Sequence, residues 1–387
     1  MHILYVLNEF PVVSQTFVSN EIEELRRLGH RVTVIASRGG KRRSPPYPDL
    51  ALATLSLRRL LIAHARFLLR DARAYIRFAG AALRLGHYGF PWSLSVPAVM
   101  EWLETQPRVD HIHTHFAVRA AGTAELIRQC IGCSRSVTTH AADIYLSTDR
   151  ALRARLRNAT VGTVTDYNRK LLTERGIHVA GLVRCGVHIP ERSGADYYDR
   201  GPVAMSLGRL VPKKGHDTAI RGIALRNAQI THPGDRWILK IVGDGPELAR
   251  LKDLSRELDS EGQVQFLGSL NHNQVLQLLR ESRALVLACK ESPDGDADGL
   301  PVAILEAAAL KTPIIAGLVT GISEFVDTST GAGYGRISPS QVADSLLSLE
   351  LCDPIWTSRV EAAYHRVGTE FSLRGQAESL IALIAAN

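Results

Sequence analysis

An acidic loop, between a short apolar run and a helical stretch, carries residues well suited to binding a polar ligand. Residues 284–288 have the length and composition of a buried strand, and residues 302–310 those of a helix. Asp298 and Gly299 lie in the loop between them. In α/β sheets, ligands bind where a strand leads through a loop into a helix, and the free N–H groups of the helix suit phosphate. Glu306 lies one turn inside this helix, where its carboxylate could accept hydrogen bonds from hydroxyl groups.

Two other interpretations of the acidic loop make different demands. Asp294, Asp296 and Asp298 match the opening of a calcium-binding loop of the helix–loop–helix type. Such a loop needs a bidentate glutamate at its twelfth position, which here is Leu305. A solvated acidic turn would explain Asp294 and Asp296 but leaves the strand–loop–helix pattern unexplained.

Two cations follow another predicted strand, residues 202–207. Arg209 and Lys214 lie in the loop after it, next to Gly208 and Gly215. A flexible loop at a strand end can bring the planar fork of an arginine and the point charge of a lysine to a pyrophosphate. The alternative is a surface charge pair, which the position between strand and helix makes the weaker interpretation.

Histidines gather at the ends of two predicted strands in the N-terminal half. Residues 109–115 place alternate histidines on one face, the last of them His115, and residues 136–139 lead into His140. Since carboxylates and cysteines are missing from the neighbouring sequence, we expect no metal there. A structural histidine at a strand end is the alternative for His140.

Four motifs in order resemble family 4 glycosyltransferases, retaining enzymes of the GT-B fold, in their exopolysaccharide and colanic-acid branch. They are FP-x-x-S-x-TF at residues 10–17, T-x-HA-x-DI-Y at 138–145, GR-x4-KG at 208–215 and VGDGPE at 242–247. The donor motif of the family has two glutamates separated by seven residues. Here the second is Glu306, but Asp298 replaces the first. The shorter side chain implies a different pocket near the donor sugar.

The resemblance implies a role for each matching residue. Arg209 and Lys214 would stabilise the leaving diphosphate, Glu306 would hold the ribose, Asp298 the sugar, and His140 the sugar or the incoming hydroxyl. Further donor contacts would come from Gly208, Gly243, Gly299, Leu300 and Pro301. The acceptor side would be formed by Ser14, Thr16, His115 and Asp143. The resemblance implies a nucleoside diphosphate sugar as donor, no cofactor and no required metal.

The implied architecture is α/β, with two Rossmann-like domains facing across a cleft. We expect an acceptor-side domain at 1–185, a linker at 186–200 and a nucleotide-sugar domain at 201–370. Residues 371–387 are expected to form a helix that crosses back to domain one. No G-x-G-x-x-G opens the first helix, which argues against a nicotinamide cofactor.

The charge of this 387-residue chain is concentrated in one segment. The net charge is +7, and residues 41–84 contain ten basic residues against two aspartates, an excess of 10 − 2 = +8. The remainder is close to neutral, so no nucleic-acid partner is expected. Within 59–84 the arginines share one helical face, which fits either a solvated face of a helical layer or docking on an anionic membrane or a phosphorylated acceptor. The opposite face would carry Leu61, His64, Leu68, Tyr75, Phe78 and Leu85.

The cysteine content and the absence of long apolar runs indicate in which compartment the protein resides. Five cysteines, an odd number, argue against a disulfide framework, and Cys130 and Cys133 are expected to be packing thiols. No apolar run is long enough to span a membrane, and residues 1–10 lack the features of a signal peptide. We expect a cytoplasmic bacterial protein, peripheral on the inner membrane face.

The sequence therefore predicts a retaining glycosyltransferase that uses a UDP- or GDP-sugar. The acceptor would be a hydroxyl group, either of a lipid-linked or other saccharide or of a small-molecule natural-product aglycone. Two alternatives stay open. One is a GT-B epimerase or hydrolase of nucleotide sugars, and the other is a non-catalytic membrane-surface protein.

Overall fold

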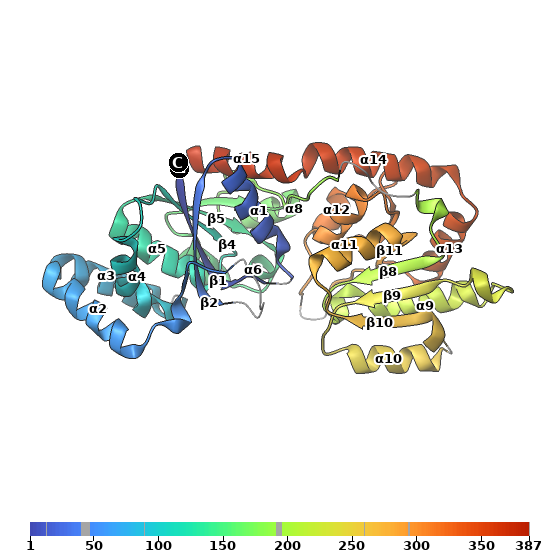
Figure 1. The fold of residues 1–387 in the computed structure, drawn as a ribbon, viewed down its shortest axis with the longest axis horizontal. Coiled ribbons are helices and arrows are strands. Elements are labelled where there is room, and N and C mark those ends of the chain that lie inside the picture. Colours follow the sequence, from blue (N-terminus) through green and yellow to red (C-terminus); the bar gives the residue numbers. More distant parts are fainter. Residues whose placement is uncertain are drawn as a thin grey trace. The chain divides into compact units, whose positions relative to one another are not determined.

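The chain alternates strand and helix twice over, and each series of strands forms one parallel sheet (Figure 1). A computed structural model describes the chain except for residues 13, 40–46, 89, 191–195, 259, 293–294 and 387. The chain divides into two compact units. Unit 1 comprises residues 1–184 and 376–387, and unit 2 comprises residues 185–375. The predicted α/β class with two Rossmann-like sheets is confirmed.

Unit 1 contains a seven-stranded sheet in the order β3-β2-β1-β4-β5-β6-β7. Ile3 of β1 lies opposite Val32 of β2 and His111 of β4, all in parallel register. The carboxyl ends of the strands therefore share one edge, where His115, His140 and the loop before α1 follow. The strands are β1 (His2–Phe10), β2 (Arg31–Gly39), β3 (Leu50–Ala51), β4 (His111–His115), β5 (Ser134–Thr139), β6 (Thr160–Thr163) and β7 (Gly181–Leu182).

The helices of unit 1 bury apolar faces against this sheet, as α1 does with Phe17, Val18, Ile22 and Leu25. The expected basic segment forms two helices, because Asp71 interrupts it and accepts a hydrogen bond from the N–H of Ala74 at 2.8 Å. The helices are α1 (Thr16–Arg27), α2 (Leu57–Arg70), α3 (Ala72–Leu85), α4 (Val96–Leu103), α5 (Arg119–Ile131), α6 (Ala141–Tyr145), α7 (Asp149–Leu156) and α8 (Asp166–Glu174).

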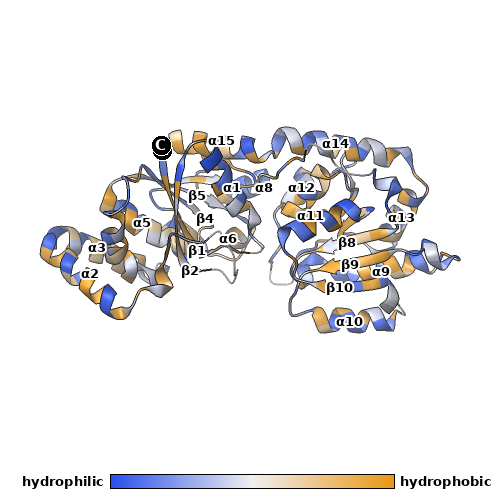
Figure 2. Ribbon diagram, viewed as in Figure 1, coloured by the Kyte–Doolittle hydropathy of each residue, from blue (hydrophilic) through white to orange (hydrophobic). Residues whose placement is uncertain are grey.

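The structure has the expected apolar face of the basic segment only in part, since Phe78 and Leu85 are buried but two of its leucines are not. Leu61 and Leu68, expected on the buried side, are 63% and 43% exposed. The buried face of α2 is centred on Ala63, because α2 packs against α4 through that side. Arg66 pairs with Glu101 at 3.7 Å, and Arg70 pairs with Glu104. Solvent therefore meets a mixture of apolar and basic side chains, which is visible as two colours along α2 and α3 (Figure 2).

Unit 2 contains a six-stranded parallel sheet in the order β10-β9-β8-β11-β12-β13. Its central strand β11 is apolar over its whole length, because core clusters cover both faces of the sheet. The strands are β8 (Val203–Leu207), β9 (Ile238–Val242), β10 (Val264–Gly268), β11 (Ala284–Leu287), β12 (Ile314–Gly317) and β13 (Ala332–Tyr334). The helices are α9 (His216–Asn227), α10 (Leu248–Glu257), α11 (His272–Glu281), α12 (Val302–Ala309), α13 (Pro339–Glu350) and α14 (Pro354–Glu370).

The last helix, α15 (Leu373–Ala385), begins in unit 2 and belongs to unit 1 from residue 376 onward. A Cβ at Gly162 of β6 would lie only 2.9 Å from Leu383, so the helix packs closely on the first sheet. Residues 186–200, expected as a linker, fall within unit 2, where Tyr197 and Arg200 are buried. Among the described residues, no helix has both the length and the apolarity needed to cross a membrane.

Candidate functional site

The cationic loop of unit 2 is held by two glycines in conformations that other residues rarely adopt. Gly208 and Gly215 have φ of 145° and 64°. A Cβ at Gly215 would lie 1.8 Å from the carbonyl oxygen of Ala288, the residue that follows β11. A Cβ at Gly243 would lie 1.8 Å from the carbonyl oxygen of Gly208. The loops after β8, β9 and β11 therefore meet at the carboxyl edge of the sheet, as the motifs predict.

Lysines of this loop pair with aspartates of the acidic loop. Lys214 Nζ lies 2.8 Å from Asp298 Oδ2, and Lys213 Nζ lies 2.8 Å from Asp296 Oδ1 and 3.5 Å from Asp298 Oδ1. Burial alone would raise the pKa of the Asp298 carboxyl, but Lys214 and Lys213 outweigh burial and lower that pKa. The site thus holds ionised, mutually compensated groups within a largely buried loop junction.

These ion pairs bear on two interpretations of the acidic loop. Asp296 is not part of a solvated turn, since its carboxylate pairs with the buried Lys213. Asp298, expected at the sugar, contacts the lysine that was expected at the diphosphate. Asp294 lies outside the described residues. The role of Lys213 was not predicted from the sequence, although its position beside Lys214 in the cationic loop was a signal.

Glu306 is a buried carboxylate on the first turns of α12. Burial raises the pKa of its carboxyl to about 7, and its Oε1 lies 3.5 Å from His272 Nδ1. Pro301 occupies the N-cap of α12, one position earlier than a first-turn proline. The Thr320 hydroxyl holds the preceding turn by donating to the carbonyl groups of Asp298 and Gly299. Leu300 packs against the core below, and Arg209 is exposed.

In unit 1 the expected acceptor-side residues His115 and His140 lie in contact. His115 Nδ1 is 3.0 Å from His140 Nε2, and both side chains are buried. Burial, and then the neighbouring His115, lower the pKa of His140 well below its ordinary value, so the ring is neutral. Phe116 stacks on the His140 ring with centroids 4.2 Å apart.

Asp143 shapes the chain around His140. Its carboxylate accepts the N–H of His140 at 2.7 Å and the N–H of Ala117, and with His140 it forms a capping box at the start of α6. Burial raises the pKa of Asp143 to about 7, against these hydrogen bonds. Ser14 is exposed and Thr16 half-buried at the start of α1. The contact with His140 from this segment comes from Phe17, at 5.0 Å between ring centroids.

Sequence reasoning also missed Glu21, and its premise that no carboxylate lies near the histidines was wrong. Glu21 Oε1 lies 2.8 Å from His115 Nε2, although 94 residues separate them in the chain. Glu21, His113 and His115 offer ligand atoms within 4.8 Å of one another, a spacing that could hold a metal ion. Glu21 and His115 bond directly to each other, however, and His113 Nδ1 lies 2.8 Å from the Ser136 hydroxyl. That this site needs no metal stays a prediction.

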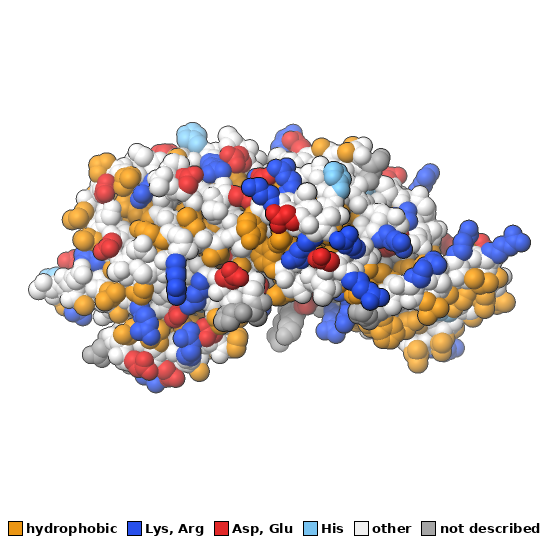
Figure 3. Space-filling view, turned by 180° about the vertical axis from the view of Figure 1, so that it is seen from behind, with side chains coloured by type: hydrophobic (Ala, Val, Ile, Leu, Met, Phe, Trp, Pro, Cys, Tyr) orange, Lys and Arg blue, Asp and Glu red, His pale blue; other side chains and the backbone are white. Residues whose placement is uncertain are grey.

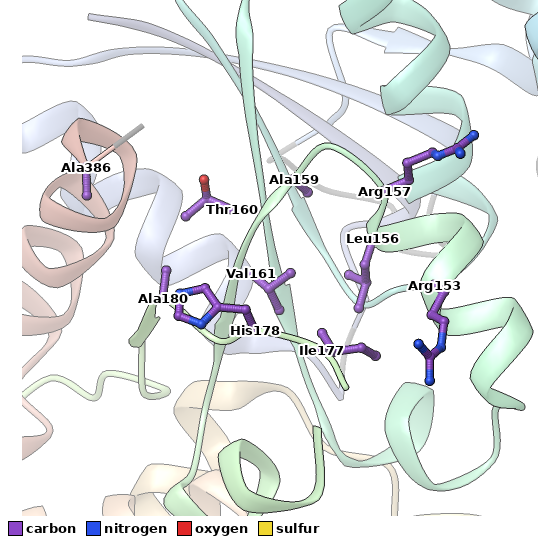
Figure 4. A pocket seen from close by; sticks show the side chains of 10 residues that line it. All are labelled: Arg153, Leu156, Arg157, Ala159, Thr160, Val161, Ile177, His178, Ala180 and Ala386. Carbon is purple, nitrogen blue, oxygen red and sulfur yellow. The ribbon is translucent and has the colours of Figure 1, made fainter. Parts of the chain in front are cut away.

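One pocket lies away from all these residues. It has a volume of about 430 Å³ and is lined by Arg153, Val161, His178 and their neighbours (Figure 4). It lies where β6 begins, whereas the predicted residues follow the carboxyl ends of the parallel strands. The pocket is therefore separate from the candidate site.

Comparison with solved structures identifies the class of fold. The crystal structure of Anabaena Alr3699/HepE in complex with UDP-glucose is similar over 100% of both chains, with a TM-score of 0.71 at 15% identity. A sucrose-phosphate synthase from Thermosynechococcus elongatus is similar over 100% of this chain and 99% of its own, with a TM-score of 0.68 at 17% identity. These likenesses and the two parallel sheets define the GT-B fold.

Comparison of sequences shows which proteins the chain resembles. The model of glycosyl transferases group 1 matches residues 191–366. The chain is 26% identical to the amylovoran biosynthesis glycosyltransferase AmsK of Erwinia amylovora over 96% of both proteins. It is 27% identical to the putative colanic acid biosynthesis glycosyltransferase WcaL of Escherichia coli K12 over 84% of this chain and 85% of the relative. The family model thus matches most of unit 2, and the chain is similar over most of its length to glycosyltransferases of group 1, also called family 4.

Proposed function

We propose that this enzyme transfers a glycosyl group from a UDP- or GDP-sugar to a hydroxyl group, with retention of the anomeric configuration, during exopolysaccharide assembly. The observation that carries the proposal is the junction of the cationic and acidic loops of unit 2. It brings Lys214 to 2.8 Å from Asp298 at the carboxyl edge of the sheet, beside the amino end of α12. A diphosphate could replace the aspartate as the partner of Lys214.

Each donor group then has a chemical task. Arg209 and Lys214 stabilise the negative charge that develops on the leaving diphosphate. Released from Lys214, Asp298 accepts hydrogen bonds from the sugar hydroxyls, and Glu306 accepts them from the ribose. The donor can approach the backbone closely at Gly208, Gly243, Gly299, Leu300 and Pro301. The reaction takes place in the cytoplasm and requires no metal or other cofactor.

The groups of unit 1 serve the acceptor. His140 contacts the sugar or the incoming hydroxyl, and Ser14, Thr16, His115 and Asp143 shape the surface around it. The polysaccharide context is supported by the activities in the names of AmsK and WcaL, which act in amylovoran and colanic acid biosynthesis.

Incubation with donor alone and with donor plus acceptor tests the reaction class. We expect slow or no turnover of UDP- and GDP-sugars alone, and release of nucleoside diphosphate with a new glycoside once a saccharide acceptor is added. Equal release of free sugar without acceptor would favour a hydrolase, and a new nucleotide sugar would favour an epimerase. Absence of any binding of the nucleotide sugars would favour the non-catalytic alternative.

We further propose that the acceptor is a lipid-linked saccharide, reached while α2 and α3 rest on an anionic membrane. Nine of the 18 exposed large hydrophobic side chains among the described residues lie between positions 57 and 94. Figure 3 shows hydrophobic side chains gathered on the part of unit 1 that carries these helices, with basic side chains beside them. The exposed arginines there include Arg58, Arg59, Arg73, Arg77 and Arg84. Apolar side chains flanked by arginines match a bilayer with anionic headgroups.

A pocket beside α3 adds to this surface. Its volume is about 630 Å³, and its walls are mostly apolar, including Tyr75, Phe78, Leu83 and Leu94. Its size is that of a typical ligand pocket, and its lining suits a hydrocarbon chain better than a sugar.

Vesicle sedimentation tests the membrane contact. The protein should bind vesicles of phosphatidylglycerol more tightly than vesicles of phosphatidylcholine, and salt should weaken the binding. Leu61→Asp with Leu83→Asp should abolish binding, because both side chains are exposed and their loss spares the core. Leu351→Asp is the matched control, since Leu351 is 72% exposed in unit 2. Equal binding by the double variant and the control would contradict the proposal.

A further inference from the structure

A buried chain of hydrogen bonds connects four side chains of unit 1 and ends at His140. The Tyr5 hydroxyl donates to Glu21 Oε1 at 2.6 Å, and Glu21 Oε1 lies 2.8 Å from His115 Nε2. His115 Nδ1 in turn lies 3.0 Å from His140 Nε2. The residues come from β1, α1, β4 and the end of β5, and none is more than 7% exposed. Four elements thus converge on one imidazole.

Glu21 occupies a position that packing alone would give to an apolar residue. On the same buried side of α1 lie Phe17, Val18, Ile22 and Leu25. Burying a carboxylate is costly unless hydrogen bonds satisfy it. The hydrogen bonds that Glu21 makes, rather than its packing, therefore explain why a glutamate occupies this position.

The chain of hydrogen bonds has a direction. An ionised carboxylate can only accept, so the Tyr5 hydroxyl and the Nε2–H of His115 both donate to Glu21. In the neutral form of His115 this leaves a lone pair on Nδ1, to which His140 donates its Nε2–H. His140 is left with Nδ1 as an unprotonated acceptor.

The opposite side of the His140 ring agrees with this direction. In the capping box the side chain of His140 faces the backbone N–H of Asp143. Since a backbone N–H can only donate, the ring nitrogen on that side must accept. Stacking by Phe116 and contact with Phe17 hold the plane of the ring.

We propose that Glu21 is a positioning residue that acts through His115 to hold His140 in one orientation and one tautomer, with Nε2 protonated and Nδ1 as an acceptor. In this tautomer the Nδ1 lone pair faces the backbone N–H of Asp143, so the ring is fixed at the acceptor side, whereas an Nδ1–H tautomer would set two donors against each other. The catalytic consequence rests on the proposed function, but the tautomer is a property of the resting protein.

Nitrogen NMR of the protein with ¹⁵N-labelled histidine tests the tautomer without any turnover. We expect His140 to carry its proton on Nε2 and none on Nδ1 at pH 7, and His115 to carry a proton on the Nε2 that faces Glu21. A His140 that carries its proton on Nδ1 would overturn the proposal, whether or not glycosyl transfer is detected.

Two substitutions then test the role of Glu21. Glu21→Met leaves His115 Nε2 without its acceptor, so we expect a mixture of His140 tautomers and a kcat lowered roughly 10- to 100-fold, the size of effect that misplacement of a reacting group produces. Glu21→Gln should rescue both readouts, because its amide oxygen can accept both hydrogen bonds. The dissociation constant for UDP should stay the same in both variants, since the nucleotide groups lie in unit 2.

Glu125→Gln is the matched control. Glu125 is 5% exposed and bonds Arg128, Gln129 and Asn158 in the same unit, apart from the histidines. It should change stability but neither the tautomer of His140 nor kcat. A Glu21→Met variant that keeps the wild-type tautomer and kcat would overturn the proposal. If Glu21→Met does not fold, the wild-type spectrum and Glu21→Gln still decide the matter.

Discussion

The polar groups of the two units differ in charge, because those of unit 2 form ion pairs whereas two buried histidines of unit 1 are neutral. In unit 2, Lys213, Lys214, Asp296 and Asp298 form ion pairs at a loop junction. In unit 1, His113 and His140 are neutral, because burial and neighbouring histidines lower their pKa values well below the ordinary range. Paired charges can be exchanged for those of an incoming diphosphate. Neutral histidines have no charge to exchange, so they suit the fixed positioning of hydroxyl groups.

This difference predicts that the largest loss of activity comes from the cations of unit 2. Arg209→Ala with Lys214→Ala should lower kcat on the order of 100-fold or more for each group, because both face charge that grows in the transition state. Steady-state kinetics measures the effect, and Arg221→Ala, an exposed residue of α9, is the control. Activity within tenfold of the parent would contradict the role of these cations. EDTA should change little, and strict dependence on Mg²⁺ or Mn²⁺ would instead implicate the acidic loop.

A smaller effect should separate the two carboxylates of unit 2. Asp298→Asn should lower the rate with every donor, because an unpaired buried partner costs about 1–3 kcal/mol, or roughly 5- to 150-fold. Asp298→Glu should alter the preference among donor sugars. Glu306→Gln should weaken the binding of UDP or GDP even without a sugar. Calorimetric titration of the bare nucleotides measures this separation. If Asp298→Asn lost nucleotide affinity while Glu306→Gln kept it, the two roles would be reversed.

The binding of nucleotide should depend on pH through Glu306. Burial raises the pKa of this carboxyl to about 7, and the ionised form is the better acceptor for ribose hydroxyls. Affinity for UDP or GDP should therefore rise as pH increases through about 7, with release of a proton on binding. Titration in two buffers of different ionisation enthalpy measures that proton. An unchanged pH profile in Glu306→Gln would assign the effect to another group.

The same shift predicts a small effect on stability. A carboxyl whose pKa is raised in the folded state stabilises the fold fully below its unfolded pKa of 4.5, and that contribution is lost as pH rises through about 7. At pH 8, Glu306→Gln should therefore melt a few degrees above the parent, while at pH 4 the two should coincide. Thermal unfolding followed by circular dichroism compares them. A lower melting temperature for the variant at pH 8 would contradict this sign.

Most of the fold could be predicted from the sequence, because the apolar pattern of the strands and the motifs that follow them indicate the same arrangement. Short apolar runs marked the central strands, and the predicted runs 202–207 and 284–288 correspond to β8 (Val203–Leu207) and β11 (Ala284–Leu287). The glycines of the GR-x4-KG motif occupy backbone conformations that only glycine adopts readily, so Gly208 and Gly215 were informative without any tertiary contact.

The sequence could not predict which distant side chains the fold brings into contact. Glu21 meets His115 across 94 residues, and Lys213 meets Asp296 across 83. Glu21 falls on the inward face of an ordinary amphipathic helix, where its neighbours predict a core position. Helical periodicity also misplaced Leu61 and Leu68, because the buried side of α2 is set by its packing on α4.

The central claim is that the charged junction of unit 2 activates a nucleotide sugar for transfer. The most direct measurement is mass spectrometry of the enzyme with ¹³C-labelled UDP- or GDP-sugars and a lipid-linked saccharide in phosphatidylglycerol vesicles. We predict a glycoside that carries the label in the anomeric configuration of the donor, together with free UDP or GDP. The same product should be absent with Arg209→Ala/Lys214→Ala and present with Arg221→Ala. Undiminished product from the double variant, or label found only in free sugar or in a new nucleotide sugar, would contradict the account.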